Sequence, residues 1–461
     1  MNKLMKSFFL LSMLFAIVVW SVGCTASDQQ QVQDSNSSEP SVQSMPQDDS
    51  GSDSQPEEQS LPPMPDEPVT LTLYSHWAAI NNDNDVQALF GTALEQYPNA
   101  SIELLRGVNM QDLIAAGEVP DLVAVPNGSM FDMLELELAS DLTQFIEDYE
   151  IDLERFVPEA IDAIRSYSDK GEFLAIPYTL NYGLLIYNQD IFDQFAVPYP
   201  EDGMTWDELN DLSQRVTQTY DGVQFIGLDP GAIKSLSRSY LLPAMDETEE
   251  KPILHSEGYQ NLFAVLKRIY DIPGIVDRDA NRYSYGIDFF LKEQRLAMHS
   301  VWLAAITSRL PEHGDSLNWD LAGHPVFPER PDIGKEIEFQ SLLVTPNSEN
   351  KIAAYYIIQA MVSDESQQKM NRGKNLTILN KPEWHKNFAS DTQLFEGKNL
   401  EGIFSVKPAP ASRYTKYDNQ LYNYVGEALR AVVLENADIN SALRAANEKA
   451  EQYIAERKAQ Q

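Results

Sequence analysis

The alternation of hydrophobic and polar residues indicates that the folded part of the chain begins near residue 69. Residues 69–74 alternate with the two-residue period of a β-strand, and residues 101–105 predict a second strand. Residues 83–97 and 110–116 carry helical spacing, and residues 121–125 form an apolar strand. This β-α-β-α-β order with short loops predicts an α/β fold with a parallel or mixed sheet.

A long β-rich segment at residues 172–188 predicts a strand that passes between two lobes. Pro177 and Gly183 interrupt this segment, which also carries several polar aromatic residues. The chain beyond its first 68 residues exceeds the size at which a single hydrophobic core keeps growing, roughly 250–300 residues. Two lobes are therefore expected, and residues 339–344 and 376–379 predict strands that could cross back.

Helical periodicity and one capping signal predict further helices. Thr205 and Glu208 form a capping box, because the threonine can accept a hydrogen bond from the first turn while the glutamate reaches back. We expect that helix to run to Tyr220 and Trp206 to pack into the core. The other helices are expected at residues 189–195, 257–270, 284–295, 350–371, 418–435 and 439–457.

The N-terminus predicts export. Lys3 and Lys6 precede an apolar run at residues 8–20, which is too short to span a bilayer comfortably but suits a signal peptide over residues 1–23. The run ends at Ser-Val-Gly-Cys, which resembles a lipobox, although Ser21 stands where an aliphatic residue is usual. An ordinary signal peptide with a chance cysteine nearby is the alternative.

Cys24 is the only cysteine among 461 residues. The chain therefore has no disulfide framework, no cysteine metal site and no second thiol. We expect Cys24 to be acylated, by palmitate or a similar chain, and to hold the protein on the cell membrane facing outward. A cysteine-nucleophile enzyme is excluded if this cysteine is lipidated.

Residues 24–68 predict a disordered acidic tether. From residue 25 onward this stretch has ten acidic residues, no Lys or Arg and almost no large apolar side chains, so burial cannot offset its ordering entropy. The whole chain has a formal net charge of −36. Nucleic acid is excluded as a partner, because phosphate neutralisation needs Lys and Arg clusters that are missing.

Five segments in order resemble one family. The run from Phe173 to Phe192 resembles the interlobe segment of the family 1 extracellular solute-binding proteins of ABC sugar importers, which are maltose-binding-protein-like. The other four segments lie at residues 117–123, 204–209, 290–302 and 342–348. Within residues 290–302, Glu293-Gln294 and Ser300-Val301 replace the family's usual glycines. The similarity covers residues 69–457.

The resemblance implies a two-lobe periplasmic-binding-protein-like fold of type II, with discontinuous lobes joined by hinge crossings. Lobe 1 would comprise residues 69–177 plus 342–378, and lobe 2 residues 181–338 plus 382–461. Such lobes close on a ligand by a hinge motion. The implied function is capture of a mono- or oligosaccharide, without a cofactor or metal, by a monomer. The implied partners are ABC permease subunits with a cytoplasmic ATPase.

A sugar site needs aromatic platforms and planar hydrogen-bonding side chains in a cleft. Such aromatic residues more often pack at interfaces than bind ligands. Strand ends and the family's positions together give these candidate ligand-binding residues: Trp302, Tyr178, Asn181, Trp77, Tyr182, Asn127, His76, Asp229, Tyr414 and Arg413.

Enzyme signatures are missing from the sequence. No metalloprotease, nucleophile-elbow, phosphate-loop or dinucleotide motif occurs, and the six histidines are scattered. An extracellular polysaccharide-active enzyme stays open as an alternative, because its two carboxylates have no fixed spacing. The same receptor with a non-sugar ligand, such as a polyol phosphate or a peptide, is a nearer alternative. A cleft lined by aromatic residues and lacking an acid pair would favour binding.

Overall fold

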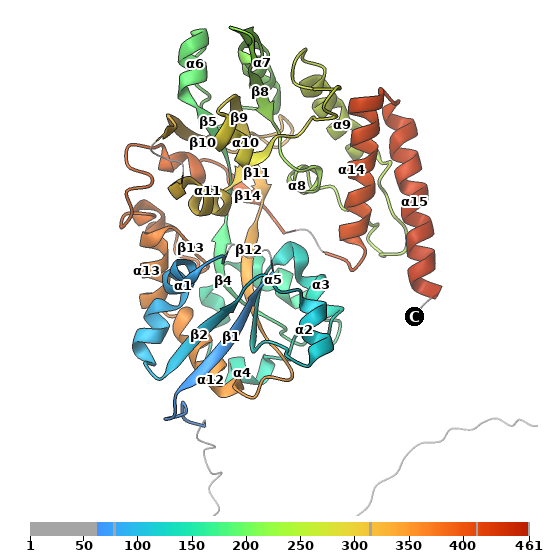
Figure 1. The fold of residues 1–461 in the computed structure, drawn as a ribbon. Helices are drawn as coiled ribbons and strands as arrows, with labels where there is room; N and C mark the ends of the chain where they lie inside the picture. The colour runs from blue at the N-terminus through green and yellow to red at the C-terminus, as the bar shows by residue number, and fades with distance from the viewer. Residues whose placement is uncertain (1–61, 77–79, 313–315, 412–413, 460–461) are drawn as a thin grey trace, which may run out of the picture. The chain divides into compact units, whose positions relative to one another are not determined.

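The computed structural model describes residues 62–76, 80–312, 316–411 and 414–459 (Figure 1). The predicted signal peptide, Cys24 and most of the predicted tether lie outside the described residues. The described residues belong to one compact unit. Among them, no helix combines the length and the apolar character needed to cross a membrane.

A six-stranded mixed sheet forms the centre of one half of the folded unit, which is called the first half below. Its strand order is β13-β4-β12-β3-β1-β2, in which β1 runs parallel to both β2 and β3 while β12 runs antiparallel to β3 and β4. Leu71, Leu73 and Leu122 of this sheet are fully buried. The strands are β1 (Val69–Ser75), β2 (Ala100–Leu105), β3 (Leu122–Pro126), β4 (Ile176–Asn181), β12 (Glu338–Val344) and β13 (Leu376–Thr377).

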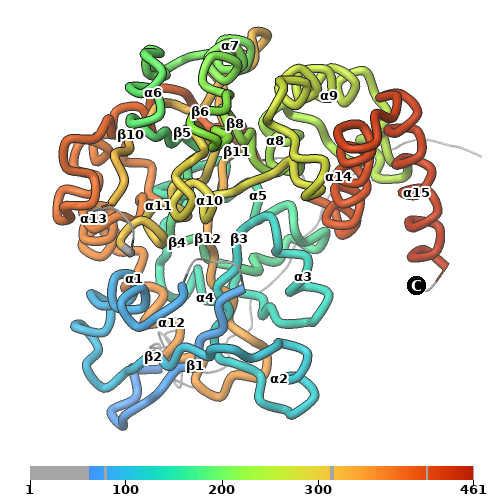
Figure 2. The backbone as a smooth tube through the Cα atoms, turned by 45° about the horizontal axis from the view of Figure 1, so that its top comes forward, coloured from blue at the N-terminus to red at the C-terminus, as the bar shows by residue number. Residues whose placement is uncertain are grey.

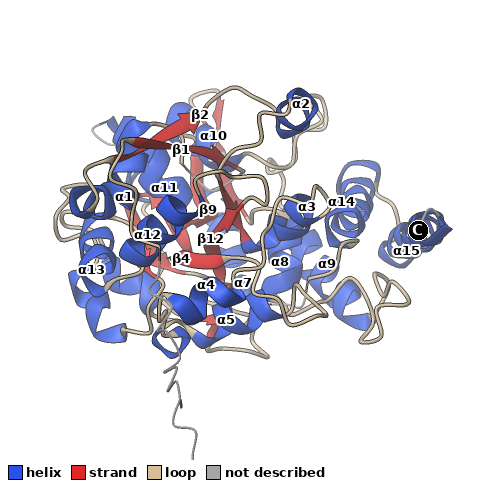
Figure 3. Cartoon of the chain, turned by 90° about the horizontal axis from the view of Figure 1, so that it is seen from below, coloured by secondary structure: helices blue, strands red, loops and turns tan. Residues whose placement is uncertain are grey.

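Helices surround this sheet, as the view from below shows (Figure 3). They bury its apolar side chains, and α12 packs on β1 and β12 and against α1. The helices of this half are α1 (Asp83–Gln96), α2 (Met110–Ala116), α3 (Met130–Leu134), α4 (Thr143–Asp148), α5 (Pro158–Arg165), α12 (Lys351–Met361) and α13 (Asp364–Gly373).

A four-stranded sheet of order β10-β5-β9-β8 forms the second half. Strand β5 runs antiparallel to β10 and β9, and β8 runs parallel to β9. The strands are β5 (Gly183–Asn188), β8 (Ile226–Asp229), β9 (Leu296–Trp302) and β10 (Trp319–Gly323). Two-stranded ribbons are formed by β6 (Thr219–Tyr220) with β7 (Val223–Gln224) and by β11 (Ile333–Glu336) with β14 (Lys407–Ala409).

The long helices α14 and α15 pack side by side. Helix α14 also packs against α8, and both helices pack against α9 (Figure 2).

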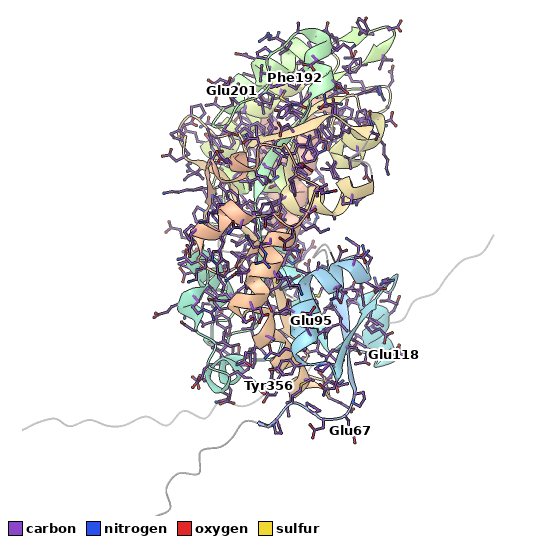
Figure 4. All side chains as sticks on the ribbon, turned by 90° about the vertical axis from the view of Figure 1, so that its left-hand side faces the viewer. Glu67, Glu95, Glu118, Phe192, Glu201 and Tyr356 are labelled. Carbon is purple, nitrogen blue, oxygen red and sulfur yellow. The ribbon has the colours of Figure 1, made fainter. Side chains whose placement is uncertain are left out.

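Exposed glutamates lie on both halves, with Glu67, Glu95 and Glu118 on the first and Glu201 on the second (Figure 4). The helices of the second half are α6 (Gln189–Phe195), α7 (Trp206–Val216), α8 (Ile233–Ser239), α9 (Glu257–Tyr270), α10 (Gly286–Glu293), α11 (Leu303–Arg309), α14 (Asp418–Glu435) and α15 (Ile439–Ala459).

Two short crossings leave the six-stranded sheet, one to β5 of the four-stranded sheet and one to β11 of the two-stranded ribbon. Only Tyr182 separates β4 from β5, and only Ile337 separates β11 from β12. Gly183 begins β5, and a Cβ atom there would lie 2.3 Å from the Cβ and Cδ atoms of Lys335. The two crossings therefore touch at a position that has room only for glycine. Pro177 lies inside β4 and does not interrupt it, so the predicted break falls only at Tyr182 and Gly183.

The capping box at Thr205 is confirmed, as is the packing of Trp206, which is 1% exposed. The predicted extension of that helix to Tyr220 is wrong, because α7 ends at Val216 and the chain turns into a hairpin. Asp221 and Gly222 at its tip have φ values of 49° and 76°. Asp-Gly with positive φ at both positions is a preferred two-residue hairpin turn.

The single helix predicted at residues 350–371 is also wrong. It divides into α12 and α13, because the Ser363 side chain accepts a hydrogen bond from the backbone of Ser366 and starts a new helix. The helix predicted at residues 284–295 is shorter than expected and spans Gly286–Glu293.

Candidate ligand-binding cleft

An open cavity of about 560 Å³ lies where residues from both halves meet. Strands β4, β9 and β12 and helices α8 and α11 contribute to its walls. The polar and aromatic side chains that line it are Asn81, Ser129, Asn181, Lys234, Ser235, Arg238, Trp302, Ser308, Arg309, Glu336, Glu338, Gln340 and Tyr414. Three of the predicted ligand residues, Asn181, Trp302 and Tyr414, are thus brought together.

Trp302 is the partly exposed aromatic platform of the cleft. It ends β9 and precedes the first residue of α11, so the strand and the helix both fix its backbone. The Lys335 ammonium lies 4.5 Å from the centre of its ring. A cation over an aromatic face is attracted by the ring quadrupole, so Lys335 helps to hold the indole in place.

Lys335 itself is buried, with 4% of its surface exposed. Within the described residues its ammonium forms a cation-π contact with the Trp302 ring. Burial lowers the pKa of Lys335 to about 8, although the negative charges of Glu338 and Asp229 oppose this shift. A buried positive charge therefore lies against the Trp302 ring, and its burial is costly.

Asn181 joins the two crossings to helix α11. Its side-chain amide donates to Glu338 Oε1 over 2.6 Å, and its carbonyl oxygen accepts from the Ala304 backbone over 2.9 Å. Burial raises the pKa of Glu338, and the hydrogen bond from Asn181 partly opposes this. Asn181 faces the cleft, but both ends of its amide already have partners.

A buried charge cluster forms one wall. The Arg238 guanidinium stacks 3.9 Å from the centre of the Tyr414 ring and lies 3.4 Å from Asp418 and 3.7 Å from Glu336. Tyr414 donates to Glu336 over 3.1 Å. Burial raises the pKa of Asp418, while the charge of Arg238 opposes the shift. Arg238 is thus shared by two carboxylates, and this wall presents charged groups that are held in place by one another.

Asn127 lies behind the cleft wall and is 1% exposed. Its amide donates to Ile337 O over 3.3 Å and to the Tyr414 hydroxyl over 3.2 Å. Tyr178 is also 1% exposed and lines a small pocket of about 40 Å³ that adjoins the cleft. Their predicted role in binding remains a prediction.

Tyr182 and Asp229 lie away from the cleft. Tyr182 lines a separate cavity of about 380 Å³ with Pro382 and His385, because successive strand residues point to opposite faces. Asp229 is buried and accepts hydrogen bonds from the backbone of Gly231, Tyr285 and Gly286 over 2.8, 2.6 and 2.7 Å. These contacts favour a structural role for Asp229.

His76 lies at the end of β1, with Nε2 3.5 Å from Asp132. Burial alone would raise the pKa of Asp132, but hydrogen bonds from His76 and Asn419 hold this pKa below its usual value. Trp77 and Arg413 lie outside the described residues.

Sequence reasoning missed several cleft residues. Glu336, Glu338 and Gln340 stand at every second position of one segment, and this period could have revealed a polar strand face. Lys234 and Arg238 stand four apart on α8, a helix that was not predicted. Among the described residues, no group of three His, Cys, Asp or Glu side chains could hold a metal ion.

The fold and the cleft define a two-lobe solute-binding protein. The sequence profile of the bacterial extracellular solute-binding proteins matches residues 109–395, which is more than half of the chain. The chain therefore belongs to the bacterial extracellular solute-binding protein family. A comparison with curated protein sequences gave no significant match.

Solved structures of ABC transporter binding proteins share the fold. One is an ABC substrate-binding protein from Listeria monocytogenes in complex with cycloalternan, with 17% identity, a TM-score of 0.67, and coverage of 84% of this chain and 100% of that one. A solute-binding protein from Thermotoga lettingae bound with α-D-tagatose has 17% identity, a TM-score of 0.63, and coverage of 83% and 99%. Maltose-bound MalE3 of T. maritima has 15% identity, a TM-score of 0.61, and coverage of 83% and 99%.

Proposed function

We propose that this solute-binding protein captures a mono- or oligosaccharide in the cleft and delivers it to the permease of an ABC importer. The observation that carries the proposal is the partly exposed Trp302 beside fixed hydrogen-bonding groups in an open cavity of about 560 Å³. Sugars present apolar C–H faces and rows of hydroxyls, which aromatic platforms and planar polar side chains recognise. The sugars and the sugar alcohol bound to related structures support the same class of ligand.

Thermal unfolding of the full-length protein with a panel of sugars tests this proposal. A ligand that binds only the native state raises the unfolding midpoint. We expect at least one sugar to do so and Trp302→Ala to remove most of the shift. Trp206→Phe is the matched control, because Trp206 is buried outside the cleft. If no sugar shifts the midpoint while an amino acid, peptide or polyol phosphate does, the carbohydrate assignment is wrong.

The two carboxylates in the cleft make glycoside hydrolysis a second candidate function. Glu336 and Glu338 both line the cleft, and burial raises the pKa of Glu338, as a general acid of a glycosidase would require. Both carboxylates are held by neighbours, Glu336 by Tyr414 and Glu338 by Asn181, which favours binding. Incubating each bound oligosaccharide with the protein and separating the products decides the matter, since new reducing ends that disappear in Glu338→Gln would identify a hydrolase.

We further propose that acylated Cys24 holds the protein on the outer face of the cell membrane, with residues 24–68 as the tether, and that the protein acts as a monomer. The lipobox-like sequence and the acidic, apolar-poor segment support this. Growth with labelled palmitate is expected to label the wild type but not Cys24→Ser, which is expected in the medium. Labelling of both proteins would contradict acylation at Cys24.

A further inference from the structure

A small side pocket adjoins the cleft. It has a volume of about 40 Å³ and is lined by helix α1, by β4 and by Lys374 and Asn375. Four residues line both spaces, namely Asn181, Ala304, Ser308 and Gln340. Because the two cavities share a wall, a ligand in the cleft lies directly beside the side pocket.

Two buried polar atoms on the lining residues of this pocket have no hydrogen-bond partner among the described residues. They are the hydroxyl of Tyr178, which is 1% exposed, and Oε1 of Gln340, which is 4% exposed. The amide nitrogen of Gln340 donates to Glu338 Oε1 over 3.4 Å, and this contact leaves the carbonyl end free. Burial raises the pKa of Tyr178, so its hydroxyl keeps its proton.

Tyr178 owes its position to a bulge. Gln340 pairs with Thr179 and Ser341 pairs with Pro177, so Tyr178 is the extra residue between two paired positions. Bulges re-aim side chains and are common beside functional sites. Most buried polar groups in folded proteins are hydrogen-bonded, so two unpartnered atoms at one pocket call for a ligand group.

We propose that this side pocket receives one hydroxyl-bearing carbon of the sugar, such as the hydroxymethyl arm of a hexose, whose hydroxyl accepts from Tyr178 and donates to Gln340. The size fits, because one water molecule needs roughly 10–15 Å³ of such space and a carbon with its oxygen needs two or three times as much. A sugar ring is too large for about 40 Å³. This inference rests on the proposed function and says which sugars the cleft would prefer.

Discrimination follows from the chemistry of the pocket. A site built to hydrogen-bond a hydroxyl rejects analogues that lack it, since its own polar groups are then left unpaired. Hexose-containing sugars are therefore expected to bind more tightly than their 6-deoxy analogues or the corresponding pentosides. Two sugars that differ only by one methylene group would be discriminated far less.

Calorimetric titration of the full-length protein tests the pocket. Each hexose-containing sugar that shifts the unfolding midpoint, with maltose and mannobiose included from the start, is titrated beside its 6-deoxy analogue. We expect the wild type to prefer the hydroxylated sugar by about tenfold or more. Tyr178→Phe and Gln340→Met are expected to lose most of this preference and to bind the 6-deoxy analogue about as well as the wild type does.

Tyr182→Phe is the matched control, because this tyrosine lines the cavity on the opposite face. It is expected to keep the full preference. Tyr178→Phe removes only an unpartnered oxygen, so its unfolding midpoint without sugar should equal or exceed that of the wild type.

The inference is overturned if the wild type binds both sugars of a pair equally, or if Tyr178→Phe keeps the preference. Either result would make the pocket a site for water alone. A panel in which no sugar binds at all would instead overturn the proposed function.

Discussion

At the scale of single residues, the buried ammonium of Lys335 stands out because it lies against Trp302, the aromatic platform of the cleft. Its side chain crosses the face of Gly183 and ends against the Trp302 ring. Burying a charge without a hydrogen-bonded partner is costly, and sites that bind ligands commonly retain such costs. Its benefit here is that it fixes the orientation of the aromatic platform.

Lys335→Met tests this cost, because methionine keeps an unbranched apolar chain without the charge. A pKa of about 8 in place of 10.5 corresponds to roughly 3 kcal/mol of destabilisation at pH 7. We expect the variant to be more stable than the wild type at pH 7 by up to that amount. Between pH 8 and 10.5 the unfolded lysine binds more protons than the folded one, so wild-type stability rises and the difference shrinks.

Urea unfolding of both proteins at pH 7, 8, 9 and 10 measures this difference. A gap that stays constant over the whole range would show that the Lys335 ammonium is not destabilised in the folded protein.

At the scale of elements, the contact between the two crossings decides how β5 can start. A methyl group at Gly183 would lie 2.3 Å from two carbon atoms of Lys335, whose buried chain cannot swing into solvent. Overpacking of this kind costs typically 1–3 kcal/mol. We expect Gly183→Ala to lose stability in that range, measured by urea unfolding, and the added change Lys335→Ala to restore part of it.

Gly373→Ala is the control for this prediction. Gly373 ends α13, and nothing lies within 4 Å of a Cβ atom placed there. Replacing a helical glycine by alanine lowers the entropy of the unfolded chain and is expected to stabilise slightly. If both alanine variants behave alike, the crossings do not restrict Gly183.

At the scale of the whole folded unit, residues 128–135 of the first half, which include helix α3, contact helices of the second half. Asn419 on α14 donates to Asp132 over 2.7 Å, and the Lys234 ammonium donates to Gly128 O over 3.2 Å. Arg457 on α15 also pairs with Glu135. These contacts stand on one side of the cleft and favour the arrangement in which the halves are close together.

We expect Asn419→Ala to shift the protein towards a more open arrangement. One hydrogen bond contributes about 0.5–1.5 kcal/mol, so the balance should change roughly fivefold, with a larger radius of gyration and weaker sugar binding. Small-angle X-ray scattering and calorimetry measure the two effects. Asn423→Ala, one turn along on the exposed face of α14, is the control and should change neither.

Local pattern by itself determined much of this protein. The alternation at residues 69–74, the helical spacing at residues 257–270 and the capping box at Thr205 each depend on neighbours in sequence, and each is found in the structure, although the helix after Thr205 ends at Val216 and not at Tyr220. The resemblance in five ordered segments also identified the family. Three cleft residues, Asn181, Trp302 and Tyr414, followed from the same reasoning.

Only the tertiary structure decided which polar groups meet. Arg238, Glu336 and Asp418 come from α8, β11 and α14, and no local period relates positions so far apart in sequence. The crossing likewise sends Asn181 into the cleft and Tyr182 to the opposite cavity, while backbone amides enclose Asp229. Sequence period fixes how an element is built, whereas long-range packing fixes which of its side chains the ligand can reach.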